Sequence, residues 1–183
     1  MMETTVTYDE KTQEFTVNSP TPLSWKYWIT NGACHANFAL VFGQTIVKGK
    51  NEGVNAFLVR VRDDQGKVMP GVSIVDMGWK IGVNGVDNGG LHFNQVKIPR
   101  TNMMTKFADV TPDGKFICDV KKNYERFFKV TERLLSGRIC IASLSISSAR
   151  TCLYITMKYA KQRLCVGKSG LSDTPIFEYQ LYQ

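Results

Sequence analysis

The sequence predicts an α+β protein in which an antiparallel β-barrel or sandwich is followed by one long helix that begins a helical bundle. Short alternating runs of β-branched and aromatic residues, separated by turn-forming residues, fill the first hundred residues. Residues 127–163 contain no proline and a single glycine, and their apolar positions recur at steps of three and four. We therefore expect a β domain at residues 3–117 and the start of an α-helical domain at residues 118–183.

The β domain is expected to hold about seven short strands. A barrel is favoured over a sandwich because nothing in the pattern obviously protects the edges of an open sheet. The expected strands are residues 5–8, 14–17, a strand around Trp28, and residues 38–46, 54–61, 72–75 and 91–98.

The helical part is expected to be interrupted once. Gly137 predicts a break or kink, with a short helix before it and a long one after it. Residues 167–173 are expected to form a loop, and Pro175 suits the first turn of a further helix. One long amphipathic helix cannot bury its own apolar stripe, so we expect its partner helices outside this chain.

Composition describes an ordinary globular protein, with 43% hydrophobic and 21% charged residues among 183. No uninterrupted apolar run approaches the ~20 residues of a membrane span. The net charge of +7 comes from dispersed Lys and Arg residues, which suit a solvated surface or phosphate contacts and not nucleic-acid binding. The five cysteines are odd in number and never spaced as CxxC, so we expect reduced thiols in a non-secretory compartment.

The stretch Lys-Tyr-Trp-Ile-Thr-Asn-Gly-Ala at residues 26–33 is the strongest candidate for a site. Trp28 and Thr30 lie near a strand end, and the Asn-Gly pair predicts a tight turn after them. An indole beside a hydroxyl at the rim of a sheet can form one wall of a slot for a flat conjugated ring. The alternative is a hairpin in which Trp28 simply fills the core.

Three other signals are weak. The glycine-dense stretch at residues 78–90 lacks the G-x-G-x-x-G spacing of a dinucleotide site, and Gly167-Lys168-Ser169 imitates the end of a P-loop without its first glycine. His35 and His92 have no ligand partners at metal-binding spacing, so no metal site is expected.

Trp-Ile-Thr-Asn-Gly at residues 28–32 resembles the flavin-contacting segment in the middle domain of the acyl-CoA dehydrogenase and acyl-CoA oxidase superfamily. The second half of the chain resembles the oxidases more than the dehydrogenases. The similarity covers nearly the whole chain but not a whole family member, so we expect an incomplete segment: the middle β domain and the first long helix of a truncated four-helix bundle. Further matching motifs follow in order at residues 87–89, 98–104, 112–114, 135–139 and 159–160, with Arg163 after them.

The resemblance implies FAD as cofactor and an acyl-CoA thioester as substrate. In the oxidases O₂ accepts the electrons, which gives trans-2-enoyl-CoA and hydrogen peroxide in the first step of peroxisomal fatty-acid β-oxidation. It also implies a homodimer in the full-length protein and a peroxisomal location. By this resemblance Trp28 lies against the isoalloxazine and Thr30 bonds near its reactive edge.

The same resemblance gives roles to two arginines. Arg163 matches an arginine that reaches the FAD pyrophosphate of a neighbouring subunit, the alternative being a surface arginine at a helix end. Arg138 matches an arginine near the substrate end of the site, and a buried structural ion pair is an equal alternative. The family's catalytic glutamate lies beyond residue 183, so no catalytic residue is assigned and this segment alone is expected to be inactive.

Thr30 departs from the oxidase pattern, since many oxidases have glycine there and threonine is commoner in the dehydrogenases. An acyl-CoA dehydrogenase that passes electrons to an electron-transfer flavoprotein, with a mitochondrial location, is therefore the first alternative. A non-enzymatic β module that has lost flavin is the second.

Overall fold

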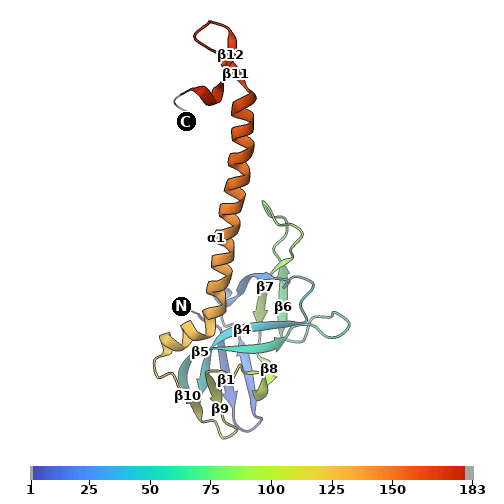
Figure 1. Ribbon diagram of the computed structural model, residues 1–183. Helices are drawn as coiled ribbons and strands as arrows, with labels where there is room; N and C mark the ends of the chain where they lie inside the picture. The colour runs from blue at the N-terminus through green and yellow to red at the C-terminus, as the bar shows by residue number, and fades with distance from the viewer. Residues whose placement is uncertain (1, 180–183) are drawn as a thin grey trace. The chain divides into compact units, whose positions relative to one another are not determined.

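The computed structural model describes residues 2–179, without the side chain of residue 133, and its chain forms two compact units (Figure 1). The first unit is Met1–Thr131 and the second is Glu132–Gln183. The residue pattern placed the domain boundary earlier, at residues 117 and 118, and that boundary stays a prediction.

The largest sheet of the first unit has five strands in the order β5-β4-β1-β2-β8. Its neighbours are antiparallel except β1 and β4, which run parallel with Thr5 opposite Gln44, so the expectation of a wholly antiparallel sheet is wrong. The chain forms β2 and β3 before it reaches the far side of β1, where β4 runs in the same direction as β1. The strands are β1 (Thr5–Asp9), β2 (Glu14–Asn18), β4 (Phe38–Val47), β5 (Lys50–Arg60) and β8 (Val96–Pro99).

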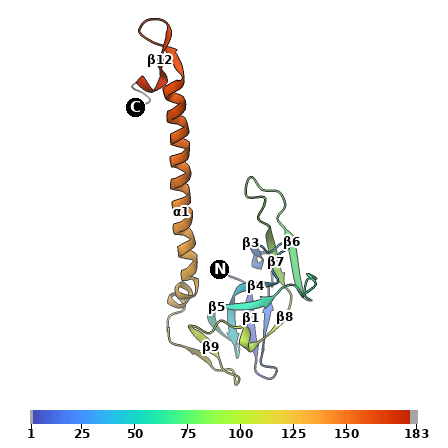
Figure 2. The same cartoon turned by 45° about the vertical axis from the view of Figure 1, so that its right-hand side comes forward.

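A second sheet of three strands has the order β3-β7-β6, with all neighbours antiparallel (Figure 2). The single strand expected at residues 91–98 is in fact two strands in different sheets, β7 and β8. Gln95 between them has a φ of 53°, a left-handed conformation that redirects the chain from one sheet to the other. The strands of this sheet are β3 (Lys26–Thr30), β6 (Val72–Asp76) and β7 (Asn88–Phe93).

Smaller elements complete the first unit. The ladder of β9 (Ala108–Val110) and β10 (Phe116–Cys118) is closed by a turn in which Gly114 has a φ of 73°. Short 3-10 helices are η1 (Pro22–Ser24) and η2 (Arg100–Asn102). The other expected strands are confirmed within a few residues.

The two sheets share one hydrophobic core. Phe15 and Phe57 of the five-stranded sheet are fully buried and meet edge to face with ring centroids 5.0 Å apart, and Leu91 and Phe93 of the three-stranded sheet belong to the same cluster. Burying a side chain of this size stabilises a fold by about 1.5–3 kcal/mol. The hydrogen-bonded ladders do not close into a ring among residues 2–179, so the barrel stays a prediction.

Helix α1 (Asn123–Gln162) runs without interruption through Gly137, so the expected break there is wrong. Nothing lies within 4 Å of a Cβ placed at Gly137. The first turns of α1 belong to the first unit. They are anchored by Arg126, which is only 2% exposed. Its guanidinium donates to the Glu52 carbonyl and to Asn123 Oδ1, and it lies 4.9 Å from the centre of the Phe116 ring.

The second unit consists of the rest of α1 and a small terminal cap. The predicted loop connects β11 (Leu164–Val166) to β12 (Ser172–Pro175), and the helix expected at Pro175 is a 3-10 turn, η3 (Ile176–Glu178), within the described residues. Lys161 at the end of α1 lies 5.4 Å from the centre of the Phe177 ring.

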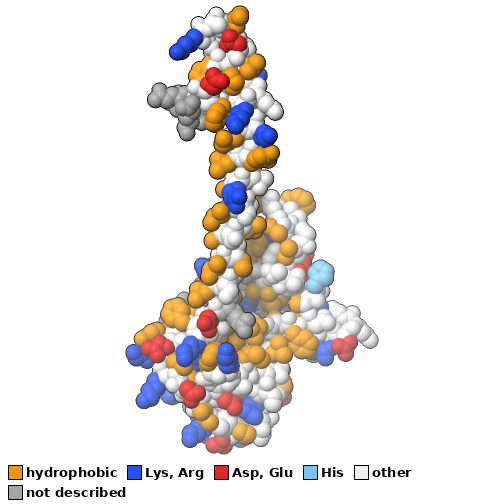
Figure 3. Space-filling view, in the orientation of Figure 1, with side chains coloured by type: hydrophobic (Ala, Val, Ile, Leu, Met, Phe, Trp, Pro, Cys, Tyr) orange, Lys and Arg blue, Asp and Glu red, His pale blue; other side chains and the backbone are white. Residues whose placement is uncertain are grey.

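Apolar side chains of α1 lie on its surface along its length, as Figure 3 shows. Leu134–Gln162 is long and apolar enough to cross a membrane. The sequence pattern did not predict this property, because polar residues interrupt every apolar run. The core helix of a water-soluble bundle has the same length and composition, so this property alone is weak support for a membrane helix.

Candidate functional site

A cleft of about 770 Å³ opens at one end of the three-stranded sheet. Because the three strands are antiparallel, the end of β3, the start of β7 and the end of β6 meet at the same edge. The walls of the cleft therefore come from the Trp28 segment and from the loop that joins β6 to β7. The cleft is lined by Tyr27, Trp28, Thr30, Met77, Trp79, Lys80, Ile81, Gly82, Val83, Val86 and Asn88.

Trp28 is turned out of the sheet by its own backbone. Its φ is 60°, and the pairing of β3 with β7 is irregular between Lys26 and Ile29, on either side of it. A bulky residue in this left-handed region costs about 1–3 kcal/mol and is common at functional sites. The Trp28 residue is 52% exposed, so the alternative in which it fills the core does not hold in this structure.

Thr30 lies at the end of the same strand, directly opposite Asn88 of β7. Both residues line the cleft, and the Thr30 side chain is exposed. The indole and the hydroxyl that the sequence placed together are therefore on one open rim. This arrangement provides an apolar wall with a hydrogen-bonding group beside it.

The opposite wall is the loop of residues 77–86, which Asn84 holds in shape. Its Oδ1 accepts from the Lys80 backbone N–H at 2.8 Å, and its Nδ2 donates to the Lys80 carbonyl at 2.9 Å. The Lys80 Nζ donates to the Val86 carbonyl at 2.9 Å. With the polar groups paired in this way, the loop presents exposed Trp79 and Ile81 to the cleft.

Arg138 and Arg163 belong to the second unit, whereas the cleft belongs to the first. Arg138 lies on α1 with its side chain exposed, so it is not part of a buried ion pair here. Arg163 follows α1 directly; its N–H donates to the Tyr159 carbonyl and its own carbonyl accepts from the Ile176 N–H, both at 2.8 Å. The Arg163 side chain is exposed, and both roles stay predictions.

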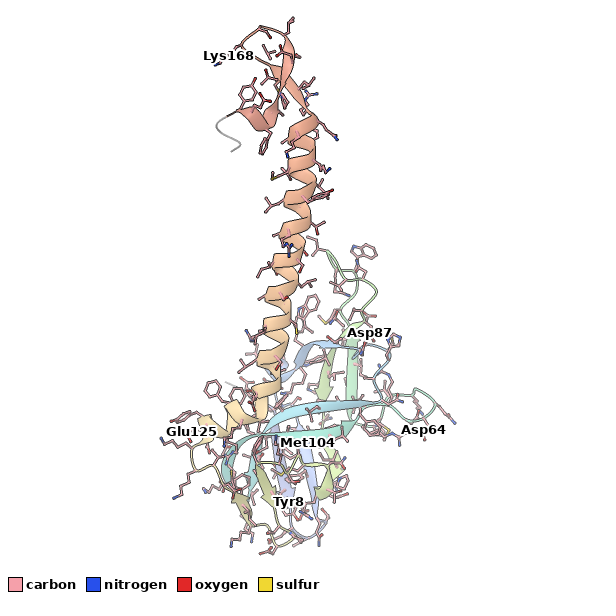
Figure 4. All side chains as sticks on the ribbon, in the orientation of Figure 1. Tyr8, Asp64, Asp87, Met104, Glu125 and Lys168 are labelled. Carbon is pink, nitrogen blue, oxygen red and sulfur yellow. The ribbon has the colours of Figure 1, made fainter. Side chains whose placement is uncertain are left out.

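A cluster that the sequence did not predict lies next to the cleft, where Cys34 and His35 meet Asp87. Asp87 is labelled in Figure 4. Asp87 Oδ2 accepts from the Cys34 N–H at 2.6 Å and from the His35 N–H at 3.2 Å. Burial by itself raises the pKa of Asp87, but these hydrogen bonds outweigh it and hold the pKa well below its usual range. The spacing of residues around His35 did not indicate this contact, because the pairing of β3 with β7 brings in a carboxylate from far along the sequence.

No family model matches the chain. Among curated relatives, acyl-coenzyme A oxidase 3, peroxisomal, from Arabidopsis thaliana is 44% identical over 162 residues, which cover 88% of this chain and 24% of that protein. Peroxisomal acyl-coenzyme A oxidase 3 from Homo sapiens is 34% identical over 184 residues, which cover 100% of this chain and 26% of that protein. Over the segment that it covers, this chain is similar to acyl-CoA oxidases. It spans about a quarter of the length of these oxidases.

Solved structures of acyl-CoA oxidases agree. Acyl-CoA oxidase 3 from Yarrowia lipolytica matches with a TM-score of 0.85 and 33% identity, over 97% of this chain and 25% of that one. Acyl-CoA oxidase-1 from Caenorhabditis elegans, complexed with FAD and ATP, matches with a TM-score of 0.77 and 33% identity, over 98% of this chain and 26% of that one. The resemblance found in the sequence motifs is confirmed.

Proposed function

We propose that this chain forms the flavin-binding β part and the first bundle helix of an FAD-dependent acyl-CoA oxidase. The whole protein would convert an acyl-CoA and O₂ to trans-2-enoyl-CoA and hydrogen peroxide, the first step of peroxisomal fatty-acid β-oxidation. The observation that carries the proposal is the cleft in which exposed Trp28 and Thr30 share one rim. Its support from relatives is twofold: several are named peroxisomal acyl-CoA oxidases, and one solved structure holds FAD.

The residues present fit a flavin. The apolar walls of the cleft suit a flat tricyclic ring, with the Trp28 indole against one face, and the Thr30 hydroxyl suits a hydrogen bond to a ring edge whose charge changes on reduction. Bound FAD would supply the two-electron oxidation of the α and β carbons and the transfer of those electrons to O₂. The protein's part in this proposal is to hold and orient the ring.

The second unit would complete the site from a neighbouring subunit. In a homodimer the exposed Arg163 guanidinium would reach the FAD pyrophosphate, for which its planar fork is well suited. Arg138 would lie near the substrate end. The exposed apolar residues of α1 support a place in a four-helix bundle, with residues 3–117 as the barrel-like middle domain and residues 118–183 as the start of the helical domain.

No residue of this chain is proposed as the catalytic base, so the segment alone should not turn over acyl-CoA. The dehydrogenase alternative rests on Thr30, which would crowd the flavin edge that O₂ must approach. A peroxidase-coupled assay on the full-length protein in air separates the two. We expect peroxide on addition of acyl-CoA without another acceptor; bleaching of the flavin without peroxide would reject the oxidase.

A further inference from the structure

We propose that Cys34, His35 and Asp87 form a Zn²⁺ site beside the cleft. Three atoms of the types that zinc prefers lie within 4.8 Å of one another: the Cys34 Sγ, the His35 Nδ1 and a carboxylate oxygen of Asp87. The pair distances are 3.2 Å from Sγ to Nδ1 and 3.3 Å from Nδ1 to Oδ2. Zinc–ligand lengths of 2.0–2.3 Å in a tetrahedron separate ligand atoms by about 3.3–3.6 Å, so these two pairs already lie close to the spacing of zinc ligands.

A second observation points to a missing cation. The Asp87 side chain is only 10% exposed, and its Oδ1 is buried with no hydrogen-bond partner among residues 2–179. The charge of this carboxylate faces a single ion-pairing group there, the His35 imidazole. The two backbone N–H groups compensate the charge at Oδ2, whereas Oδ1 keeps lone pairs that are free for a cation.

The arrangement does not suit a nucleophilic triad. A thiol–imidazole–carboxylate relay needs one imidazole nitrogen toward the sulfur and the other toward the carboxylate. Here the same atom, His35 Nδ1, approaches both Cys34 Sγ and Asp87 Oδ2. Three ligand atoms grouped in this way suit the binding of a metal ion better than a proton relay.

The loop that carries Cys34 and His35 is held in place before any ion binds. The Arg62 guanidinium donates to the carbonyls of Gly32, Ala33 and Ala36. The Asn31 N–H donates to the Asp87 carbonyl at 2.9 Å, which ties the loop to the start of β7. Such preorganisation reduces the ordering cost of binding.

The site would use three protein ligands and leave a fourth position to solvent, because Cys34 and His35 are exposed. Binding would transfer the Cys34 thiol proton to solvent and leave a thiolate on the metal. Since Asp87 adjoins Asn88 and Cys34 follows Thr30 closely, the ion would fasten together the two segments that carry one rim of the cleft.

The test is metal binding by the 183-residue chain, measured with Zn²⁺ against a chromophoric chelator and with Co²⁺ by absorption spectroscopy. We expect one zinc per chain and, with cobalt, a thiolate-to-metal charge-transfer band. Cys34→Ser should abolish the band and weaken zinc binding at least about 100-fold, whereas Cys140→Ser, which removes an exposed thiol of α1, should change neither.

Asp87→Asn keeps an oxygen acceptor for the two backbone N–H groups and removes the charge, so it should also weaken zinc binding while circular dichroism shows the fold retained. If Asp87→Asn fails to fold, Cys34→Ser alone decides. Zinc affinity unchanged in Cys34→Ser, or a cobalt complex without the thiolate band, would overturn the proposal.

Discussion

The two units of this chain treat their apolar residues in opposite ways. In the β unit Phe57 is 0% exposed and packs inside a core shared by two sheets, whereas Leu153 on α1 is 62% exposed. Two sheets can bury their apolar faces against each other within one stretch of chain. A single helix has no second element against which to bury its apolar stripe. The β unit is therefore expected to carry its own stability, and the helix to depend on partners.

The largest expected effect tests that contrast directly. Phe57→Ala should destabilise the β unit by about 3–5 kcal/mol, because it leaves a cavity in a close-packed core. Leu153→Ala is the matched truncation on α1 and should change the free energy of unfolding by less than about 0.5 kcal/mol. Urea denaturation of the 183-residue chain measures both, and equal losses would contradict the contrast.

A smaller loss is expected where the helix joins the β unit. Arg126→Ala should cost about 2 kcal/mol, since it removes charge-assisted hydrogen bonds to the Glu52 carbonyl and to Asn123, together with the contact to Phe116. Hydrogen exchange should then become faster in the first turns of α1 while the strands stay protected. Glu132→Ala, whose side chain on α1 is exposed, serves as the control. Uniform loss of protection in the strands would show that Arg126 stabilises the whole unit and not the junction.

The cleft predicts an effect on binding without an effect on folding. Trp28→Ala should lower the FAD affinity of the full-length protein about 10-fold or more and leave the thermal midpoint within a few degrees, because an exposed indole contributes little to the core. Leu23→Ala removes an exposed apolar side chain outside the cleft and should leave flavin content unchanged. Normal flavin occupancy in Trp28→Ala would show that the cleft is not the flavin site.

A dependence of stability on pH is expected from Lys26, whose burial lowers its pKa to about 8. Its Nζ donates to the Phe42 carbonyl at 2.8 Å. Because the unfolded chain keeps this proton up to a pKa of about 10.4, the unfolded state binds more protons between the two values, and stability should rise with pH from about 8 to 10. Lys26→Met should remove this slope in denaturation curves taken across that range, and an unchanged slope would assign it to another group.

The local pattern predicted most of the elements and one rim of the site. Alternation and turn residues located β1, β2, β4 and β5, because each of these strands has one face toward a core and is bounded by residues that favour turns. The spacing of Trp28, Thr30 and the Asn-Gly pair indicated a rim. Pattern alone failed at Gly137, where a glycine without a steric reason to bend remained helical, and at Gln95, where one left-handed residue divided an apparently continuous strand.

The sequence by itself determined the class of elements, their approximate bounds and the resemblance to acyl-CoA oxidases, because these depend on neighbouring residues and on motifs read in order. Only the tertiary structure decided that β1 and β4 run parallel, that the loop of residues 77–86 faces Trp28, and that Asp87 meets Cys34 and His35. Each of these depends on which distant strands pair and in which register. That choice is made by the burial of the shared core, and no local pattern contains it.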